Sequence, residues 1–274
     1  MKVDYKISVV IPCYNMGDFV KDALASVFKY PKQKDLEIIV VNDGSDDEGY
    51  TKRILDSYTA KNLTVVHQKN AGLGAARNKG IELATAPYII PLDADNKLRP
   101  VYIERGTALL DENPEVGMVY GDNRQFGMSE QDIKVGEFNV ARLIKKNYID
   151  ACVVLRKRAW ESVKGYDEKM PVMGYEDWDL NMRLFFKGWR FKYIPLVCYD
   201  YRVRENSMLV NSNRNRELLI SYIFSKPDLI QAKILRDKIF LSQDYENELK
   251  SIKNRKFMRV AFNIEKILKT VFKQ

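Results

Sequence analysis

Short apolar runs alternate with stretches of helical spacing, and this alternation most limits how the chain can fold. The runs are rich in β-branched side chains and end at Pro or at polar clusters, as buried strands do. They occupy residues 6–12, 36–41, 63–67 and 116–120. Residues 18–30 and 99–111 carry apolar side chains at the spacing of one helix face. The first 120 residues therefore predict an α/β fold, in which helices flank a mostly parallel sheet.

A further apolar run, at residues 88–96, ends abruptly in two carboxylates. Asp93 and Asp95 lie two residues apart, so on an extended backbone they project to the same side. Ligands of open α/β sheets bind beyond the carboxyl ends of the strands, and hard oxygen ligands there suit Mg²⁺ or Mn²⁺ carrying a phosphate. The alternative is a simple turn, because Asp and Asn are common turn residues.

Two polar loops follow other predicted strands. In residues 42–48, Asp43 is a candidate ligand-facing carboxylate, while Ser45 or Asp46 is a candidate N-cap for a helix running to Tyr58. Both interpretations can hold together. In residues 70–80, two glycines allow the backbone to turn tightly or to approach a ligand closely. The glycine pattern is not a complete GxGxxG and follows the third strand, so it is a poor match to a dinucleotide-binding fingerprint.

An acidic cluster begins the helix predicted to run to about residue 187. Glu176, Asp177 and Asp179 surround Trp178, which we expect to be exposed. Acidic residues in a first turn have an ordinary explanation, because they complement the helix dipole. A carboxylate at a helix start near a cleft is also well placed to accept a proton from a bound hydroxyl.

Two closely spaced arginines follow the acidic helix in the sequence. Arg202 and Arg204 lie two residues apart, so on an extended segment they share a face and are candidates to clamp a diphosphate. The alternative is a solvated basic edge strand.

Composition excludes several classes of protein. A hydrophobic content of 46% and an aromatic content of 11% describe a globular chain. The three cysteines are far apart and lack CxxC spacing, so they predict neither a disulfide framework nor a zinc site and fit a reducing cytoplasm. No stretch approaches the roughly 20 apolar residues that span a bilayer. The net charge of +8 is accompanied by no nucleic-acid motif, so a nucleic acid is not an expected partner.

The last residues of the chain, 250–274, hold most of the excess positive charge. This segment contains eight Lys or Arg residues and a single acidic residue, Glu265. Its apolar residues recur at helical spacing from Phe257 to Val271. One interpretation is a basic amphipathic helix on an anionic membrane, which would hold the protein at the inner face of the plasma membrane. The other is a helix packed on the body or across a homodimer, with a solvated basic face.

Together these segments resemble the family 2 glycosyltransferases, inverting enzymes of the Rossmann-like GT-A fold. The resemblance spans about residues 7–207. The matching segments are 8–15 (SVVIPCYN), 40–46 (VVNDGSD), 70–78 (NAGLGAARN), 92–95 (LDAD, the DxD motif) and 174–180 (GYEDWDL). It implies a domain at 1–208, with a nucleotide-sugar half at 1–120 and an acceptor half at 121–208, followed by a helical extension at 209–274.

The resemblance also implies roles for individual residues. Pro12, Tyr14 and Asn70 would line the nucleotide site, and Asp43 and Arg77 would hydrogen-bond a uracil-like base. Asp93 would reach the ribose or metal, and Asp95 would ligate Mg²⁺ or Mn²⁺ at the diphosphate. Asp177 would be the general base, and Glu176 and Trp178 would contact the sugar or acceptor.

The implied reaction moves a hexose or N-acetylhexosamine from a UDP-sugar to a glycan or lipid-linked acceptor, in cell-surface polysaccharide synthesis. One departure from the family pattern affects the metal. Many members carry a metal-binding histidine in the segment that here contains Arg202 and Arg204, so we expect activity to depend less on Mn²⁺ than is usual. The alternative function is a non-catalytic nucleotide-sugar or glycan-binding subunit with the same fold.

Overall fold

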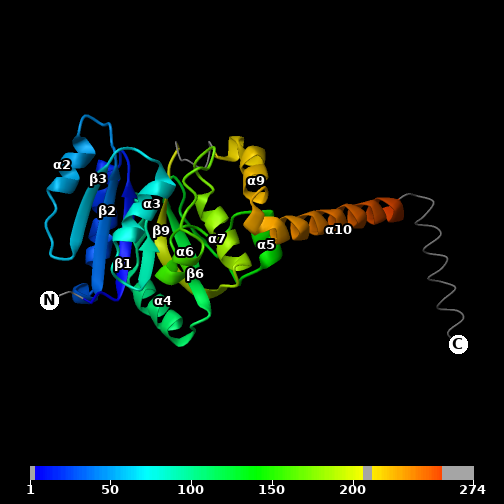
Figure 1. The fold of residues 1–274 in the computed structure, drawn as a ribbon, viewed down its shortest axis with the longest axis horizontal. Coiled ribbons are helices and arrows are strands. Elements are labelled where there is room, and N and C mark those ends of the chain that lie inside the picture. Colours follow the sequence, from blue (N-terminus) through cyan, green and yellow to red (C-terminus); the bar gives the residue numbers. More distant parts are fainter. Residues whose placement is uncertain (1–3, 206–211, 255–274) are drawn as a thin grey trace, which may run out of the picture. The chain divides into compact units, whose positions relative to one another are not determined.

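The computed structural model describes residues 4–205 and 212–254 and divides the chain into two compact units (Figure 1). The units are Met1–Ile230 and Gln231–Gln274. The predicted boundary at residue 208 falls among residues outside the described part, and the predicted division into functional domains stays a prediction.

Within the described residues of the first unit, nine strands form one mixed sheet in the order β3-β2-β1-β4-β8-β6-β9-β5, with β7 paired to β6. The strands are β1 (Ile7–Cys13), β2 (Leu36–Asp43), β3 (Leu63–Gln68), β4 (Tyr88–Pro91), β5 (Lys97–Leu98), β6 (Val116–Gly127), β7 (Gln131–Ile133), β8 (Val154–Arg156) and β9 (Arg190–Val203). Strands β1 to β4 pair in parallel, β8 runs antiparallel to both of its neighbours, and β6 and β9 pair in parallel. The predicted α/β class with a mostly parallel sheet is confirmed.

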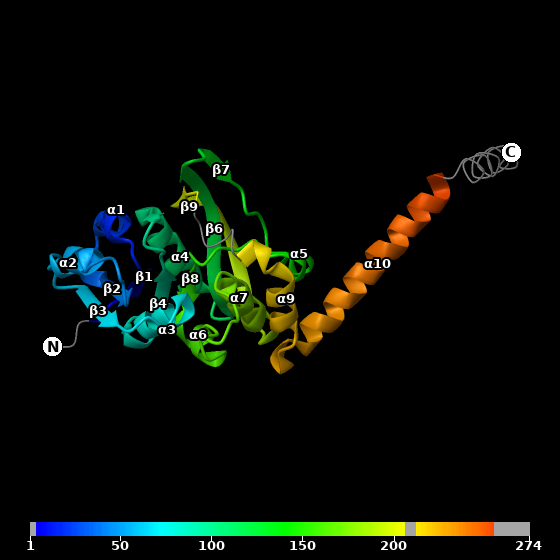
Figure 2. The same ribbon diagram turned by 90° about the horizontal axis from the view of Figure 1, so that it is seen from above.

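Helices lie on both faces of this sheet (Figures 1 and 2). They are α1 (Gly17–Phe28), α2 (Tyr50–Asp56), α3 (Leu73–Leu83), α4 (Pro100–Glu112), α5 (Val140–Lys145), α6 (Lys157–Ser162), α7 (Glu176–Phe186) and α9 (Arg216–Phe224). Ile7, Val9 and Ile11 of β1 belong to the core that α1 and α4 cover. Side chains alternate along a strand, so Val10 faces the opposite side, where α3 packs. A Cβ at Gly80 of α3 would lie 2.3 Å from Val10 Cγ1, so this close approach requires glycine.

The predicted elements of the first unit occur with ends shifted by a few residues, and one strand is much longer than predicted. Strand β6 continues from the predicted 116–120 to Gly127. The prediction that Ser45 or Asp46 caps the second helix is wrong. Helix α2 begins only at Tyr50, and it is Asp47 that accepts the backbone N–H of Thr51, at 3.1 Å. Ser45 and Asp46 instead bond Asn42 and Asn15 in the loop.

The second unit is described through helix α10 (Ile230–Asn254), which begins at the last residue of the first unit. Helices α9 and α10 both lie within residues 209–274, the segment predicted to be a helical extension. Most of the basic segment 250–274 lies outside the described residues. None of the described helices is both long enough and apolar enough to cross a bilayer.

Candidate active site

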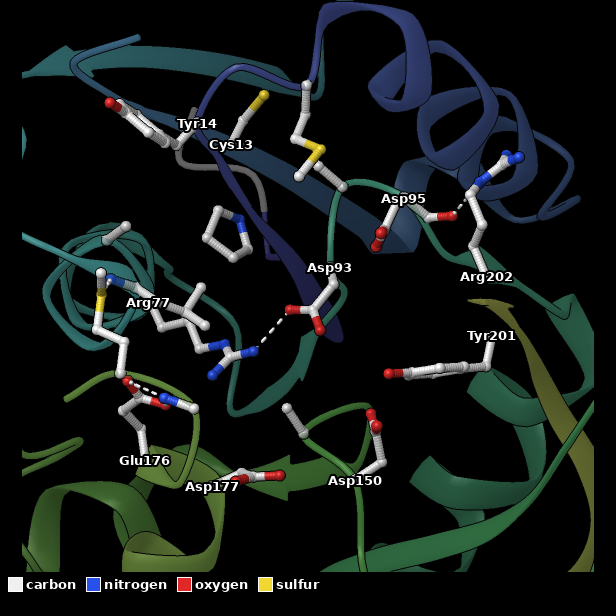
Figure 3. Close-up of a pocket in the computed structure, with 18 of the residues that line it drawn as sticks. Cys13, Tyr14, Arg77, Asp93, Asp95, Asp150, Glu176, Asp177, Tyr201 and Arg202 are labelled. Atoms are coloured by element: carbon white, nitrogen blue, oxygen red, sulfur yellow. Dashed lines mark hydrogen bonds and ion pairs between the residues drawn. The ribbon is translucent and has the colours of Figure 1, made fainter. Parts of the chain in front are cut away.

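The carboxyl ends of the parallel strands open into a cavity of about 490 Å³ (Figure 3). This is the place where open α/β sheets bind their ligands. The sequence-predicted site residues that line it are Pro12, Tyr14, Asp43, Asn70, Arg77, Asp93, Asp95, Glu176, Asp177, Arg202 and Arg204. The fold therefore brings together side chains that lie up to 192 positions apart in the chain, and Trp178 is the one predicted site residue that does not line the cavity.

Asp43, at the end of β2, holds the loop that carries Asn70. Its Oδ1 accepts hydrogen bonds from Gln68 Nε2 at 2.7 Å and from the N–H of Ala71 at 3.0 Å, and its Oδ2 accepts the N–H of Gly72 at 2.9 Å. An ionised carboxylate offers about four lone-pair sites. These three bonds therefore leave Asp43 able to accept one more hydrogen bond from a ligand.

Arg77 of α3 lies across the middle of the cavity and is paired with the DxD segment. Its Nη2 donates to Asp93 Oδ1 at 2.6 Å, and its side chain is 3% exposed. Burial alone would lower the pKa of Arg77, but the Asp93 carboxylate raises it above its usual value. Among the described residues, the buried Nε of Arg77 has no hydrogen-bond partner. One donor of this fixed cation is thus unsatisfied.

The two arginines of β9 and its extension both act on Asp95. Arg204 Nε lies 2.9 Å from Asp95 Oδ2, and Arg202 Nε donates to the Asp95 backbone carbonyl at 3.1 Å. Arg202 is further held by Asp22, at 2.7 Å, and lies over the rings of Phe19 and Phe126. Arg202 therefore positions the DxD loop, whereas Arg204 faces the carboxylate that would meet a diphosphate.

Asp93 and Asp95 fit a hard divalent cation. Each uses one carboxylate oxygen in its arginine contact, which leaves the other oxygen for a cation. No group of three His, Cys, Asp or Glu side chains arranged for a metal occurs in the part of the chain that is described. The donor set matches Mg²⁺, which proteins often hold through one or two carboxylates together with substrate phosphates.

Glu176 and Asp177 begin α7 on the opposite wall. Asp177 Oδ2 accepts Asn147 Nδ2 at 2.9 Å, and Oδ1 accepts the N–H of Trp178 at 2.8 Å. Burial, followed by the charge of Asp150, raises the pKa of Asp177 to about 7. Glu176 is 2% exposed and accepts the N–H of Gly174 with both oxygens, which fixes the loop before the helix. Asp177 is therefore a carboxylate with a pKa suited to exchanging a proton near neutral pH.

The loop at residues 147–151 contributes a carboxylate that the sequence did not single out. Asp150 lines the cavity between Asp177 and Tyr201 (Figure 3). Its Oδ1 accepts the N–H of Cys152 at 3.0 Å, and burial, followed by the charge of Asp93, raises its pKa to about 6. A single Asp before a short apolar run carries no local signal of function, so only the fold reveals it.

Trp178 was expected to be an exposed contact for sugar or acceptor, and the structure corrects this. Its side chain is 1% exposed, and its Nε1 donates to the Leu143 carbonyl at 2.6 Å. Its ring packs edge-on against Tyr175 and Phe224. Consecutive helix residues point about 100° apart. Asp177 therefore faces the cavity while its neighbour enters the core.

Comparison with known proteins places this site in a family. Residues 8–170 match the model described as "Glycosyl transferase family 2". The chain belongs to this family.

Curated relatives of the transferase include polysaccharide synthases. The chain is 25% identical to the chondroitin synthase of Pasteurella multocida over 94% of its own length and 29% of the relative. It is 37% identical to the uncharacterized glycosyltransferase YibD of Escherichia coli, over 43% of this chain and 34% of that protein. The chain thus spans about a third of the length of these relatives or less.

Solved structures share the fold of the transferase. Staphylococcus aureus TarS in complex with UDP-GlcNAc superposes with a TM-score of 0.62 and 20% identity, covering 75% of this chain and 60% of that one. The mannosyltransferase PcManGT of Pyrobaculum calidifontis, in complex with GDP-Man and Mn²⁺, gives 0.61 and 18%, covering 85% and 70%. The transferase has the GT-A fold.

Proposed function

We propose that this glycosyltransferase moves a hexose or N-acetylhexosamine from a UDP-sugar to a hydroxyl of a glycan or lipid-linked acceptor, with inversion, in cell-surface polysaccharide synthesis. The observation that carries the proposal is that carboxylates suited to two different tasks lie on opposite walls of one cavity. Asp93 and Asp95 lie on one wall, and Asp177, with a pKa of about 7, lies on the other. One wall suits a diphosphate and the other suits a proton acceptor.

The nucleotide would occupy the part of the cavity lined by Pro12, Tyr14, Asp43 and Asn70. Asp43 has the capacity to accept one further hydrogen bond, which the N3–H of a uracil would donate. Arg77 lines the same cavity and has an unsatisfied donor in its buried Nε, which a small movement of the side chain would bring to the base. The UDP-GlcNAc and UDP complexes of TarS support the choice of a uridine nucleotide.

In the proposed reaction, Asp177 accepts the proton of the acceptor hydroxyl while that oxygen bonds to the anomeric carbon. The bond from this carbon to the diphosphate oxygen breaks in the same displacement, and UDP leaves with the bonding electrons. No covalent enzyme intermediate is required. When bound at Asp93 and Asp95, Mg²⁺ or Mn²⁺ would neutralise charge on the leaving diphosphate. Arg204 would share that task, because its cation lies beside Asp95.

Calorimetric titration of UDP, with and without Mn²⁺, tests the donor site first. We expect Mn²⁺ to strengthen UDP binding and Asp95→Ala to remove that gain. Asp56→Ala is the matched control, because Asp56 is an exposed aspartate paired with Lys52 outside the cavity. Failure of UDP to bind under either condition would contradict the proposal.

A screen of UDP-sugars for transfer then tests the reaction. Tight UDP binding without transfer from any donor would instead favour the non-catalytic subunit. Cytoplasmic location, homodimerisation and membrane contact through residues 250–274 remain predictions. Liposome sedimentation of the full chain beside a chain ending near Ser251 tests the membrane contact, and equal pelleting would contradict it.

A further inference from the structure

The acceptor side of the cavity is lined by groups that accept hydrogen bonds. Asp150 and Asp177 present carboxylates, and Asn123 and Asn147 are further lining residues. The Asn147 amide is oriented by its Nδ2, which donates to Asp177 at 2.9 Å, and that of Asn123 by its Nδ2, which donates to Tyr199 at 3.3 Å. Their Oδ1 atoms are buried and have no hydrogen-bond partner within the described residues.

Buried acceptors without partners are costly, because they have given up their hydrogen bonds to water and gained none in the protein. Once either side chain turns slightly toward the cavity, a ligand that donates hydrogen bonds would satisfy its oxygen. Sugar hydroxyls do so, whereas an ionised carboxylate or a phosphate diester has no proton to donate. These four groups come from β6, from the loop at residues 147–151 and from the start of α7. Three separate segments therefore all favour a ligand that donates hydrogen bonds.

The charges that line the cavity also disfavour an anionic ligand on the acceptor side. Among the described lining residues, six carboxylates accompany three guanidinium groups. Each guanidinium is already paired with a carboxylate: Arg77 with Asp93, Arg202 with Asp22, and Arg204 with Asp95. An anionic acceptor that approached Asp150 and Asp177 would therefore meet like charge.

We propose that the acceptor is an uncharged sugar, bound through two neighbouring hydroxyls, one donated to Asp177 and the other to Asp150. This inference rests on the proposed glycosyltransferase function and adds the class of acceptor to it. The hydroxyl at Asp177 is the one that reacts, and the hydroxyl at Asp150 fixes the orientation of the ring. A uronic acid or a phosphorylated sugar in this subsite is disfavoured by the carboxylates. Figure 3 shows both side chains on the same wall of the cavity.

Saturation-transfer NMR on the full chain with UDP and Mg²⁺ tests this directly. The probes are two matched pairs, methyl β-glucoside with methyl β-glucuronide and methyl β-galactoside with methyl β-galacturonide. The members of each pair differ only at C6. We expect at least one neutral glycoside to bind about tenfold or more tightly than its anionic partner, which corresponds to about 1.4 kcal/mol. Equal or tighter binding of the uronides, or no binding of either neutral glycoside while UDP binds, would overturn the inference.

Asp150→Asn separates a recognition role from a structural one. The variant keeps the size of the side chain and removes its charge, so the preference for the neutral glycoside should shrink toward unity. Asp132→Asn is the matched control, because Asp132 is a half-exposed aspartate of β7 paired with Arg124 and does not line the cavity. An unchanged preference in Asp150→Asn would count against the role of Asp150. If the wild-type chain does not bind UDP, the result would instead contradict the proposed function itself.

Discussion

Arg204 Nε lies 2.9 Å from Asp95 Oδ2, so an arginine faces the second carboxylate of the DxD motif. The Arg204 side chain is 28% exposed and that of Asp95 is 17% exposed, so water screens this pair only partly. Burial, followed by the charge of Asp93, raises the pKa of Asp95, and Arg204 opposes that rise. Arg204 therefore helps to keep Asp95 ionised and places a permanent cation where the diphosphate would bind.

Replacing Arg204 by Ala should make the enzyme more dependent on metal. The variant loses the charge-assisted contact between Arg204 and the diphosphate. Such a contact is worth about 1.5–3 kcal/mol, so kcat/KM for the donor should fall by roughly tenfold to a hundredfold at low Mn²⁺. Saturating Mn²⁺ should restore part of that loss, and Arg204→Lys should lie between the two. Initial rates over a Mn²⁺ series, and in EDTA, measure the effect. Complete inactivation of the wild type by EDTA, together with an unaffected Arg204→Ala, would contradict it.

Activity should rise with pH through the pKa of Asp177. A base works only when it is ionised, and the pKa of Asp177 is raised to about 7. Below that pH, kcat/KM should fall roughly tenfold per unit, because the ionised fraction does. Asp150→Asn removes a neighbouring negative charge, so it should move this acidic limb to lower pH. A limb at the same pH in both proteins would show that Asp150 does not act on the base.

Asp177→Asn should abolish transfer and leave UDP affinity intact. The amide keeps the shape of the side chain but cannot accept the proton, and loss of a general base typically costs about 10²–10⁴ in rate. Single-turnover transfer and UDP calorimetry on the same preparation measure the two effects. Transfer at the wild-type rate would assign the base elsewhere, and Asp150 would be the next candidate.

The sequence predicted the residues whose positions follow from regular elements. Asp43 and Asp93 follow parallel strands, and the carboxyl ends of such strands meet at one edge of the sheet, so their shared cavity could be foreseen. Glu176 and Asp177 begin a helix whose apolar spacing was plain. Arg202 and Arg204 were predicted to share a face, and both lie over the ring of Phe19.

The sequence could not predict what depends on pairing between distant segments. Asn123 lies in β6, whose register against β9 contains bulges that no local pattern records. Asn147 and Asp150 lie in an irregular loop, where composition carries no periodicity. Only the assembled sheet therefore shows that these three residues lie on the same side of the cavity.

Trp178 offers a test of the difference between a site residue and a core residue. Trp178→Phe keeps most of the packing but leaves the Leu143 carbonyl without its donor, so the free energy of unfolding should fall by about 1–3 kcal/mol. Trp178→Ala should cost more, about 3–5 kcal/mol, because it also opens a cavity. Urea denaturation followed by fluorescence measures both. Trp189→Phe is the matched control, because the hydrogen bond from Trp189 to Ser162 is exposed and its loss should change stability by less than about 0.5 kcal/mol. If Trp178→Phe left stability unchanged and raised the KM for the acceptor, the residue would be a sugar contact after all.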